Sequence, residues 1–395
     1  MNEATVLLQS HLARYESQLD SVFSFWANHG YDSQFGGFMT YLDKEGNHFS
    51  TDKSVWALGR GIQTFAWYYQ EVKPSIRFLN VALHTFEFMK KYAYDVDHRM
   101  YFSLTQEGLP IQKRRYWYSE AFASTGSIQL YSVTKDPRHL ALALQSYQTM
   151  RDLYYHPEKT PPKFDPSTLQ GYSLAPSMIL LKTAQTMRLF DTTNQDQYNQ
   201  DIEFAIERIL SKHVVCEKQA VFEYVSTIKP SLTSPRDRLI NPGHAIEAAW
   251  FLLDEYLYDP QKYAHLLPIV KNMVDWMVEL GWDKEHGGLL SFVDYEKKPL
   301  EQLEWDMKLW WPQCELLIAS LQLFIVTQED KYLELYLQTF DYFFKHFQID
   351  DLEFVGYLHR DNSVASTLKG NLFKGPFHIP RMLLINYRLL KDYLG

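Results

Sequence analysis

The sequence predicts an all-α protein in which about twelve helices close into two concentric rings, an (α/α)6 barrel with short β pieces in its rim loops. Three observations lead to this prediction. Apolar residues recur at helical spacing along most of the 395 residues. Six loop-like interruptions divide the chain at intervals of roughly 60 to 65 residues, enough for two helices each. Helices with apolar residues on more than one side need neighbours on both, which favours a closed ring over an open solenoid.

The first interval shows the repeating pattern most clearly. Between Leu8 and Trp26, apolar and aromatic residues lie three or four positions apart, which predicts an amphipathic helix that stops at Asn28-His-Gly30. A turn at Asp32 to Phe38 leads into a short extended piece over residues 38–42. A second helix is predicted from Val55 through Ala66.

The later interruptions repeat this arrangement of helix, loop and helix. Asp283 to Leu289 carries the same pattern as Asp32 to Phe38, Asp-x-x-x-Gly-Gly followed by an apolar residue. Because a fixed period through a chain indicates a repeat architecture, one catalytic domain is expected over residues 1–395. The other interruptions are Asp95 to Phe102, Lys163 to Asp165, Ala220 to Tyr224 and Glu353 to Tyr357.

Composition limits the classes of function. With 46% hydrophobic and 16% aromatic residues the chain can bury a large core, and its net charge of -9 argues against nucleic acid or an anionic membrane as partner. Cys216 and Cys314 form no disulfide framework, and no apolar leader follows the N-terminus. A cytoplasmic location is therefore expected.

The segment Asn241-Pro-Gly-His-Ala-Ile-Glu247 places an ionisable pair where a helix is expected to begin. His244 and Glu247, three residues apart, lie on one side of the first turn. A carboxylate there can hold an imidazole in one tautomer and tune its pKa, as a general base requires. A helix cap with a satisfied histidine is the alternative. A second histidine, His378, favours the catalytic interpretation.

Five segments together resemble the N-acylglucosamine 2-epimerase family, nearly end to end and in the family's order. The resemblance implies an (α/α)6 barrel that interconverts N-acetylglucosamine and N-acetylmannosamine, commonly as a homodimer with ATP as an allosteric activator and with no cofactor required for the chemistry. The family's functional arginine, two histidines and glutamate fall on Arg60, His244, His378 and Glu315. The five segments are Thr51 to Arg60, Tyr118 to Phe122, Asn241 to Glu247, Leu303 to Glu315 and Phe373 to Arg381.

Epimerisation at C2 explains why these residue types are needed. A proton must leave the carbon next to the aldehyde of the open-chain sugar and return to the opposite face, which one base per face accomplishes. His244 and His378 are expected to be this pair, exchanging roles with direction. Glu247 is expected to orient His244, and Glu315 to position His378 or a sugar hydroxyl. Arg60 is expected to stabilise the enediolate oxygen, or alternatively to pair with an acid such as Glu315.

Further candidates contact the substrate without carrying protons. Aromatic faces suit sugar rings, and Lys308 could equally form a local salt bridge with Asp306. No metal is expected, because no third ligand accompanies His244 and Glu247 at a suitable spacing. No P-loop or GxGxxG is present, so ATP would need a surface or rim pocket. The additional substrate-binding candidates are Trp56, Tyr118, Glu120, Trp310, Lys308 and Arg381.

Two positions bear on the choice of sugar. Relatives acting on unmodified sugars, the cellobiose 2-epimerases and aldose–ketose isomerases, typically carry a histidine in a Met-His motif where this chain reads Ser173 to Met178, so the sequence resembles the N-acyl branch. Gln63 stands where the family often has tryptophan, a departure that bears on substrate preference. The alternatives are an enzyme of unmodified sugars, a glycoside hydrolase using Glu120 and Glu315, and a non-catalytic sugar-binding protein.

Overall fold

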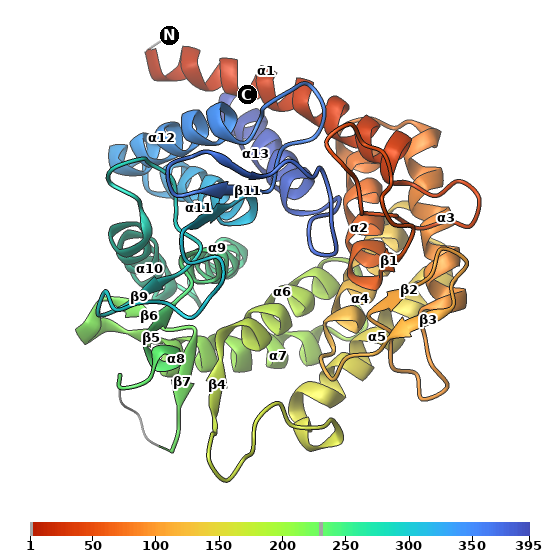
Figure 1. Ribbon diagram of the computed structural model, residues 1–395, viewed down its shortest axis with the longest axis horizontal. Helices are drawn as coiled ribbons and strands as arrows, with labels where there is room; N and C mark the ends of the chain where they lie inside the picture. Colours follow the sequence, from red (N-terminus) through yellow and green to blue (C-terminus); the bar gives the residue numbers. More distant parts are fainter. Residues whose placement is uncertain (1–2, 229–231) are drawn as a thin grey trace.

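The computed structural model describes residues 3–228 and 232–395, and in this part of the chain twelve long α-helices form two rings (Figure 1). Each inner helix packs on the next, and the last packs on the first, so the inner ring closes. The (α/α)6 barrel and the count of about twelve helices are confirmed. The inner helices are α2 (Val55–Glu71), α4 (Tyr118–Thr134), α6 (Leu174–Phe190), α9 (Pro242–Tyr258), α11 (Trp310–Thr327) and α13 (His378–Leu394).

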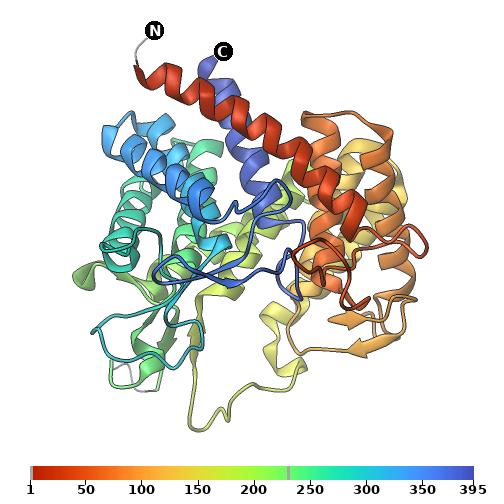
Figure 2. The same cartoon turned by 45° about the horizontal axis from the view of Figure 1, so that its top comes forward.

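The outer helices each cover one inner helix. Apolar residues every three or four positions turn one face of an outer helix inward, whereas an inner helix such as α11 is buried on nearly all sides. Figure 2 shows α1 lying across α13, so that the two ends of the chain are close together. The outer helices are α1 (Glu3–Phe25), α3 (Ile76–Tyr92), α5 (Pro137–Tyr155), α7 (Gln195–Arg208), α10 (Leu266–Gly281) and α12 (Asp330–His346).

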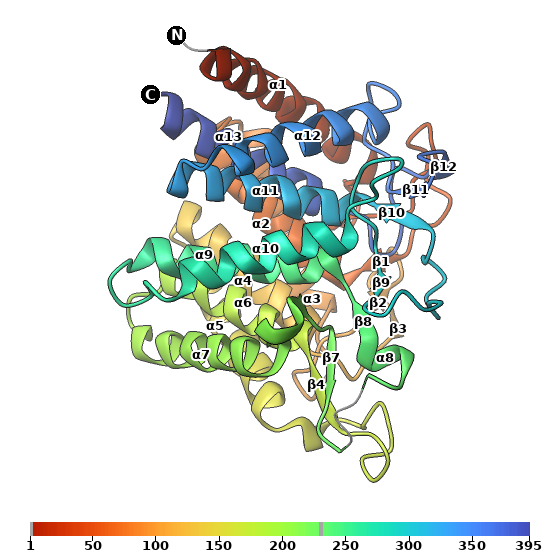
Figure 3. The ribbon, with the colours of Figure 1, turned by 90° about the vertical axis from the view of Figure 1, so that its left-hand side faces the viewer.

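Short antiparallel strands occupy the long loops that precede the inner helices, which places them at one end of the barrel (Figure 3). They pair as β1 with β2, β2 with β3, β4 with β7, β5 with β6, β8 with β9, β10 with β11 and β11 with β12. The strands are β1 (Lys53–Ser54), β2 (Ser103–Leu104), β3 (Pro110–Gln112), β4 (Gly171–Ser173), β5 (Val214–Val215), β6 (Ala220–Val221), β7 (Tyr224–Ser226), β8 (Leu239–Ile240), β9 (Val293–Asp294), β10 (Met307–Leu309), β11 (Tyr357–His359) and β12 (Val364–Ser366).

Smaller helical pieces complete the chain. The π-helix η1 (Trp26–Gly30) ends α1 at the predicted stop, and a second π-helix, η3 (Ile209–His213), follows α7. The remaining pieces are the 3-10 turns η2 (Pro157–Lys159) and η4 (Cys216–Lys218) and the four-residue helix α8 (Pro235–Arg238). Among the described helices, none combines the length and apolar character that a bilayer span requires.

The repeated Asp-x-x-x-Gly-Gly loops have a common structural role. In the first loop Asp32 forms an ion pair at 2.8 Å with Lys53, which precedes α2. In the second loop Asp283 forms one at 3.0 Å with Lys308, which precedes α11. Both lysine side chains are fully buried. The paired glycines have positive φ, between 74° and 88°, which L-residues rarely adopt. Each loop therefore ties the start of an inner helix to the rim.

Candidate active site

A cavity of about 780 Å³ lies inside the inner ring. Residues from the first turns of the inner helices line the end of the cavity where these helices begin. Six helices thus bring together side chains that are distant in the sequence. Among the predicted site residues, the lining includes Trp56, Arg60, Tyr118, His244, Glu247, Trp310, His378 and Arg381.

The start of α9 fixes His244 at this end. The Asn241 side chain caps the helix by accepting a hydrogen bond from the His244 backbone at 3.1 Å, and Pro242 takes the first helical position. The His244 Nδ1 lies 3.0 Å from Glu223 Oε2. The prediction that Glu247 orients His244 is therefore wrong, because Glu223 makes this contact. Sequence reasoning missed Glu223, although it lies within the interruption Ala220 to Tyr224.

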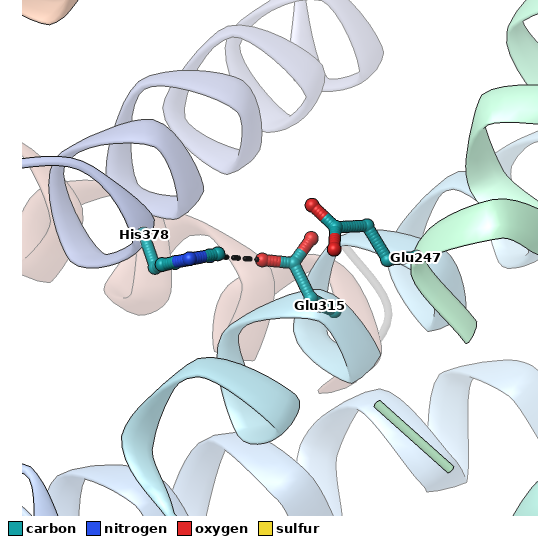
Figure 4. A group of neighbouring side chains, drawn as sticks. All are labelled: Glu247, Glu315 and His378. Carbon is teal, nitrogen blue, oxygen red and sulfur yellow. Dashed lines mark hydrogen bonds and ion pairs between the residues drawn. The ribbon is translucent and has the colours of Figure 1, made fainter. Parts of the chain in front are cut away.

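His378 is the first residue of α13, and its Nδ1 lies 2.8 Å from Glu315 Oε1 on α11 (Figure 4). The predicted contact between these residues is confirmed. Arg381, one turn further along α13, donates to Glu315 at 2.5 Å and to Glu247 at 2.6 Å. Glu315 is fully buried, so it needs these partners. The carboxylate of Glu247 is occupied by Arg381.

The surroundings push the pKa values of the two histidines in opposite directions. Burial, assisted by the positive charges of Arg381 and Arg60, lowers the pKa of His378 well below its ordinary value. Burial also acts to lower the pKa of His244, but the carboxylates of Glu223, Glu247 and Glu315 outweigh it and raise that pKa above its ordinary value. The two shifts favour the charged form of His244 and the neutral form of His378.

Arg60 presents a cation to the cavity and forms no ion pair with any described carboxylate. Its guanidinium instead stacks on Phe122 and Phe377, with its central carbon 4.0 and 4.6 Å from the ring centroids. Burial and the nearby charge of Arg381 lower the pKa of Arg60 to about 9, so it remains charged at neutral pH. The alternative expectation, pairing with Glu315, is not realised. The charge is available to an anionic group on a ligand.

One aromatic ring contacts both histidines. The Trp311 ring lies 5.0 Å from that of His244 and 5.9 Å from that of His378, between centroids. The predicted meeting of the two imidazoles in one cavity is confirmed. The double tryptophan at the start of α11 was visible in the sequence, but it did not reveal which ring faces the histidines.

Two predicted substrate contacts are wrong. Glu120 is fully buried outside the cavity lining, where its carboxylate binds Arg99 at 2.8 Å and the Met100 backbone at 2.9 Å. Lys308 is held by Asp283 behind the rim and does not line the cavity either. The alternative partner, Asp306, lies 3.1 Å from His359. Both predicted residues are charged side chains within the segments that carry the resemblance, and their burial depends on loops that fold over them.

The site contains three ligand-type side chains that lie close enough to share an ion: Glu247, Glu315 and His378, with donor atoms within 4.8 Å of one another. Arg381 donates to both of these carboxylates and already neutralises them. A metal ion would have to displace that guanidinium, so the three residues fit an arginine-centred network better than a metal site.

Comparison with known proteins identifies the family and supports the fold. The family model of N-acylglucosamine 2-epimerase (GlcNAc 2-epimerase) matches residues 36–375. The N-acylglucosamine 2-epimerases of Bos taurus and Mus musculus are 33% and 32% identical to this chain, and the alignments cover 100% and 99% of it and 94% of each relative. The solved structure of cellobiose 2-epimerase from Spirochaeta thermophila superposes with a TM-score of 0.84 over 100% of both chains, at 20% identity. The chain belongs to the N-acylglucosamine 2-epimerase family.

Proposed function

We propose that the protein is a sugar 2-epimerase that interconverts N-acetylglucosamine and N-acetylmannosamine. The observation that carries this proposal is the pair His244 and His378. They share one cavity, each Nδ1 is held by its own carboxylate, and their pKa values are displaced in opposite directions. One imidazole suited to receive a proton and one suited to give a proton are what inversion at a carbon atom requires.

The proton transfers follow from the hydrogen bonds. In neutral His378 the proton on Nδ1 is donated to Glu315, which leaves the lone pair of Nε2 as the base. That nitrogen takes the C2 proton of the open-chain sugar. The electrons of the broken C–H bond form a C1–C2 double bond, and the carbonyl electrons move to O1, which gives an enolate because C2 carries the acetamido nitrogen. Charged His244 then donates its Nε2 proton to the other face of C2, and its Nδ1–H stays with Glu223. The reverse direction exchanges these roles.

The negative charge that develops on the enolate oxygen O1 needs a partner. Arg60 lines the same cavity, carries its charge on a stacked guanidinium and has no carboxylate partner among the described residues. Its charge is fixed before the substrate arrives, so little reorganisation accompanies the reaction. Arg381, by contrast, holds Glu247 and Glu315 in place.

The choice of an N-acylated sugar is supported by the similarity to the mammalian proteins and by the lining of the cavity. The segment Ser173 to Met178, where relatives that act on unmodified sugars typically carry a histidine in a Met-His motif, contains no histidine and contributes Ala175 and Met178 to the lining. Gln63, the departure noted in the sequence, also lines the cavity. A 2-epimerase or isomerase of unmodified sugars is the second candidate, favoured by the fold shared with a cellobiose 2-epimerase. The glycoside hydrolase alternative needs Glu120 as one of its two catalytic carboxylates, and Glu120 does not line the cavity.

Incubation with N-acetylmannosamine in deuterium oxide tests the proposal. The expected result is N-acetylglucosamine with deuterium at C2. A ketose product would replace the proposal with an isomerase, and cleavage of a glycoside would replace it with a hydrolase. Binding without any of these reactions would leave a sugar-binding protein. Unmodified mannose and cellobiose, tested in parallel, separate the two epimerase candidates by their kcat/KM values.

The family resemblance also supports a homodimer that ATP activates, although ATP takes no part in the proton transfers. Sedimentation with and without ATP, together with initial rates at saturating sugar, tests both properties. A cytoplasmic location is supported by two cysteines that are both free, Cys216 and Cys314.

A further inference from the structure

The cavity continues far below the catalytic groups, toward the opposite end of the barrel. Its lining runs along α2 from Trp56 to Glu71 and along α9 from His244 to Tyr258. At the rise of an α-helix these stretches span about 21 Å, much more than one hexosamine needs. At the far end, Tyr258 is 55% exposed and Leu189 is 65% exposed, so a second mouth opens to solvent there.

Apolar side chains contribute to the lining between the two ends of the cavity. Met178, Phe251 and Ile385 line the cavity between its ends, below the histidines. The lining further from the histidines contains several charged and amide side chains. Asp254 lies two turns after Glu247 on α9, about 10 Å further down the barrel. We call this part the lower chamber and define it by Lys182, Gln185, Arg188, Asp254, Glu255 and Gln322.

The charges of the lower chamber are paired across neighbouring helices. Lys182 on α6 lies 2.6 Å from Asp254 on α9, and both side chains are 29% exposed and therefore accessible from the cavity. Deeper in the wall, Arg188 lies 2.6 Å from Glu255. At the second mouth, Arg388 faces Glu71 at 3.7 Å. Two cations thus face two carboxylates in the chamber and one more such pair lies at the mouth, so the formal charges of the chamber cancel.

This chemistry selects among classes of ligand. A nucleotide brings several negative charges, and each chamber cation already has a carboxylate partner. An apolar ligand would take the accessible pair of Lys182 and Asp254 out of water without replacing its hydrogen bonds. A neutral sugar offers hydroxyl groups that donate to carboxylate and accept from ammonium, and amide side chains such as Gln322 serve both roles.

We propose that the lower chamber is a second binding site, for a neutral sugar of the size of the substrate, reached through the mouth beside Leu189 and Tyr258. It is separate from the catalytic groups and takes no part in the proton transfers. Binding there does not depend on turnover, so the proposal stands or falls independently of the epimerase reaction.

Equilibrium dialysis with labelled N-acetylglucosamine tests this site. The double variant Lys182→Met with Asp254→Leu removes both charges together, which leaves neither unpaired, and similar volume favours folding. The matched control is Lys331→Met with Asp275→Leu, an outer-ring pair at the same 2.6 Å separation. Wild type and control should bind two sugars per chain. The chamber variant should bind one and still catalyse at the wild-type rate when substrate is saturating.

One sugar per chain in the wild type, or two in a folded chamber variant, would overturn the proposal, and the chamber would then hold only water. Competition by ATP for the second sugar would overturn the choice of a neutral ligand. A second experiment does not rely on a buried change. Leu189→Cys, combined with Cys216→Ser to remove the exposed native thiol, allows a bulky maleimide to cap the mouth. Capping should abolish binding of the second sugar, and unchanged binding of two would contradict the site.

Discussion

Glu223 and His244 are 21 residues apart, and they meet at 3.0 Å because the loop before α9 folds back over the start of that helix. The contact holds the Nδ1 of the imidazole and leaves Nε2 free to face the cavity. It also supplies the carboxylate that contributes most to raising the pKa of His244. A residue outside the recognised motifs thus determines how one of the two proton carriers behaves.

Replacing the carboxylate of Glu223 should therefore change the pH dependence of catalysis more than it changes substrate binding. In Glu223→Gln the pKa of His244 should fall, because the opposite charge that stabilises the imidazolium is gone. The high-pH limb of kcat/KM should move to lower pH, and kcat at pH 8 should drop by about tenfold, with little change in KM. Glu217→Gln, on the exposed turn η4, is a matched control. An unchanged limb would show that Glu223 has only a structural role.

The rate of the wild-type enzyme plotted against pH should be bell-shaped. Catalysis in either direction requires the histidine pair to hold one proton, so activity is lost when both imidazoles are charged and when both are neutral. The low-pH limb should lie below the ordinary histidine pKa, because His378 is lowered, and the high-pH limb should lie above it, because His244 is raised. Rates measured from pH 4 to 10 with either sugar test this. Two limbs that both lie below 6.5 would contradict the assignment.

Arg60 should act on the transition state more than on the bound sugar. Arg60→Met removes the charge proposed to stabilise the enolate oxygen, and kcat should fall by about 10² to 10³, with a smaller effect on KM. Arg60→Lys keeps a charge but loses the planar stacking on Phe122 and Phe377, so it should recover only part of the rate. Equal rates in wild type and the Met variant would remove Arg60 from the mechanism.

The rim loops should matter for stability rather than for chemistry. Asp283→Asn leaves the buried ammonium of Lys308 without its carboxylate and should lower the free energy of unfolding by about 3 to 5 kcal/mol. Asp275→Asn breaks an exposed pair with Lys331 and should cost about 0.5 kcal/mol or less. Urea titrations of both variants provide the comparison, and equal losses would contradict the buried role.

The ion pair of Asp283 and Lys308 also predicts how the stability of the fold changes in acid. Although burial acts to raise it, the ion pairs with Arg360 and Lys308 hold the pKa of Asp283 well below its ordinary value. A carboxylate with a lowered pKa stabilises the fold fully above its unfolded-state pKa, and this stabilisation is lost as the pH falls toward the folded-state pKa. The wild type should therefore lose stability more steeply than Asp283→Asn between about pH 4 and 2. Parallel slopes would contradict this.

Features that depend on the local pattern of residues could be predicted from the sequence. Helical spacing and the repeated interruptions predicted the twelve helices and the closed ring, because burial on several sides leaves a characteristic apolar pattern. The turn chemistry at Asn241 predicted the start of α9, and the motif histidines proved to share one cavity.

Features that depend on loops crossing between helices were not predictable in the same way. Glu247 lies at the spacing expected for a partner of His244, yet Arg381 from α13 takes its carboxylate and Glu223 takes the imidazole. Glu120 and Lys308 are charged residues within the segments that carry the resemblance, and only the folded rim reveals that both are buried in ion pairs. Such contacts join residues 20 or more positions apart, which periodicity cannot reveal.

The most direct test of two histidines on opposite faces of one carbon atom is deuterium exchange at C2 in His244→Asn and His378→Asn. Each variant keeps one base, so each should deprotonate and redeuterate one epimer without converting it, and the two variants should act on different epimers. Epimerisation itself should fall by about 10² to 10⁴ in both. Wild-type epimerisation in either variant, or exchange confined to the same epimer in both, would contradict the central claim.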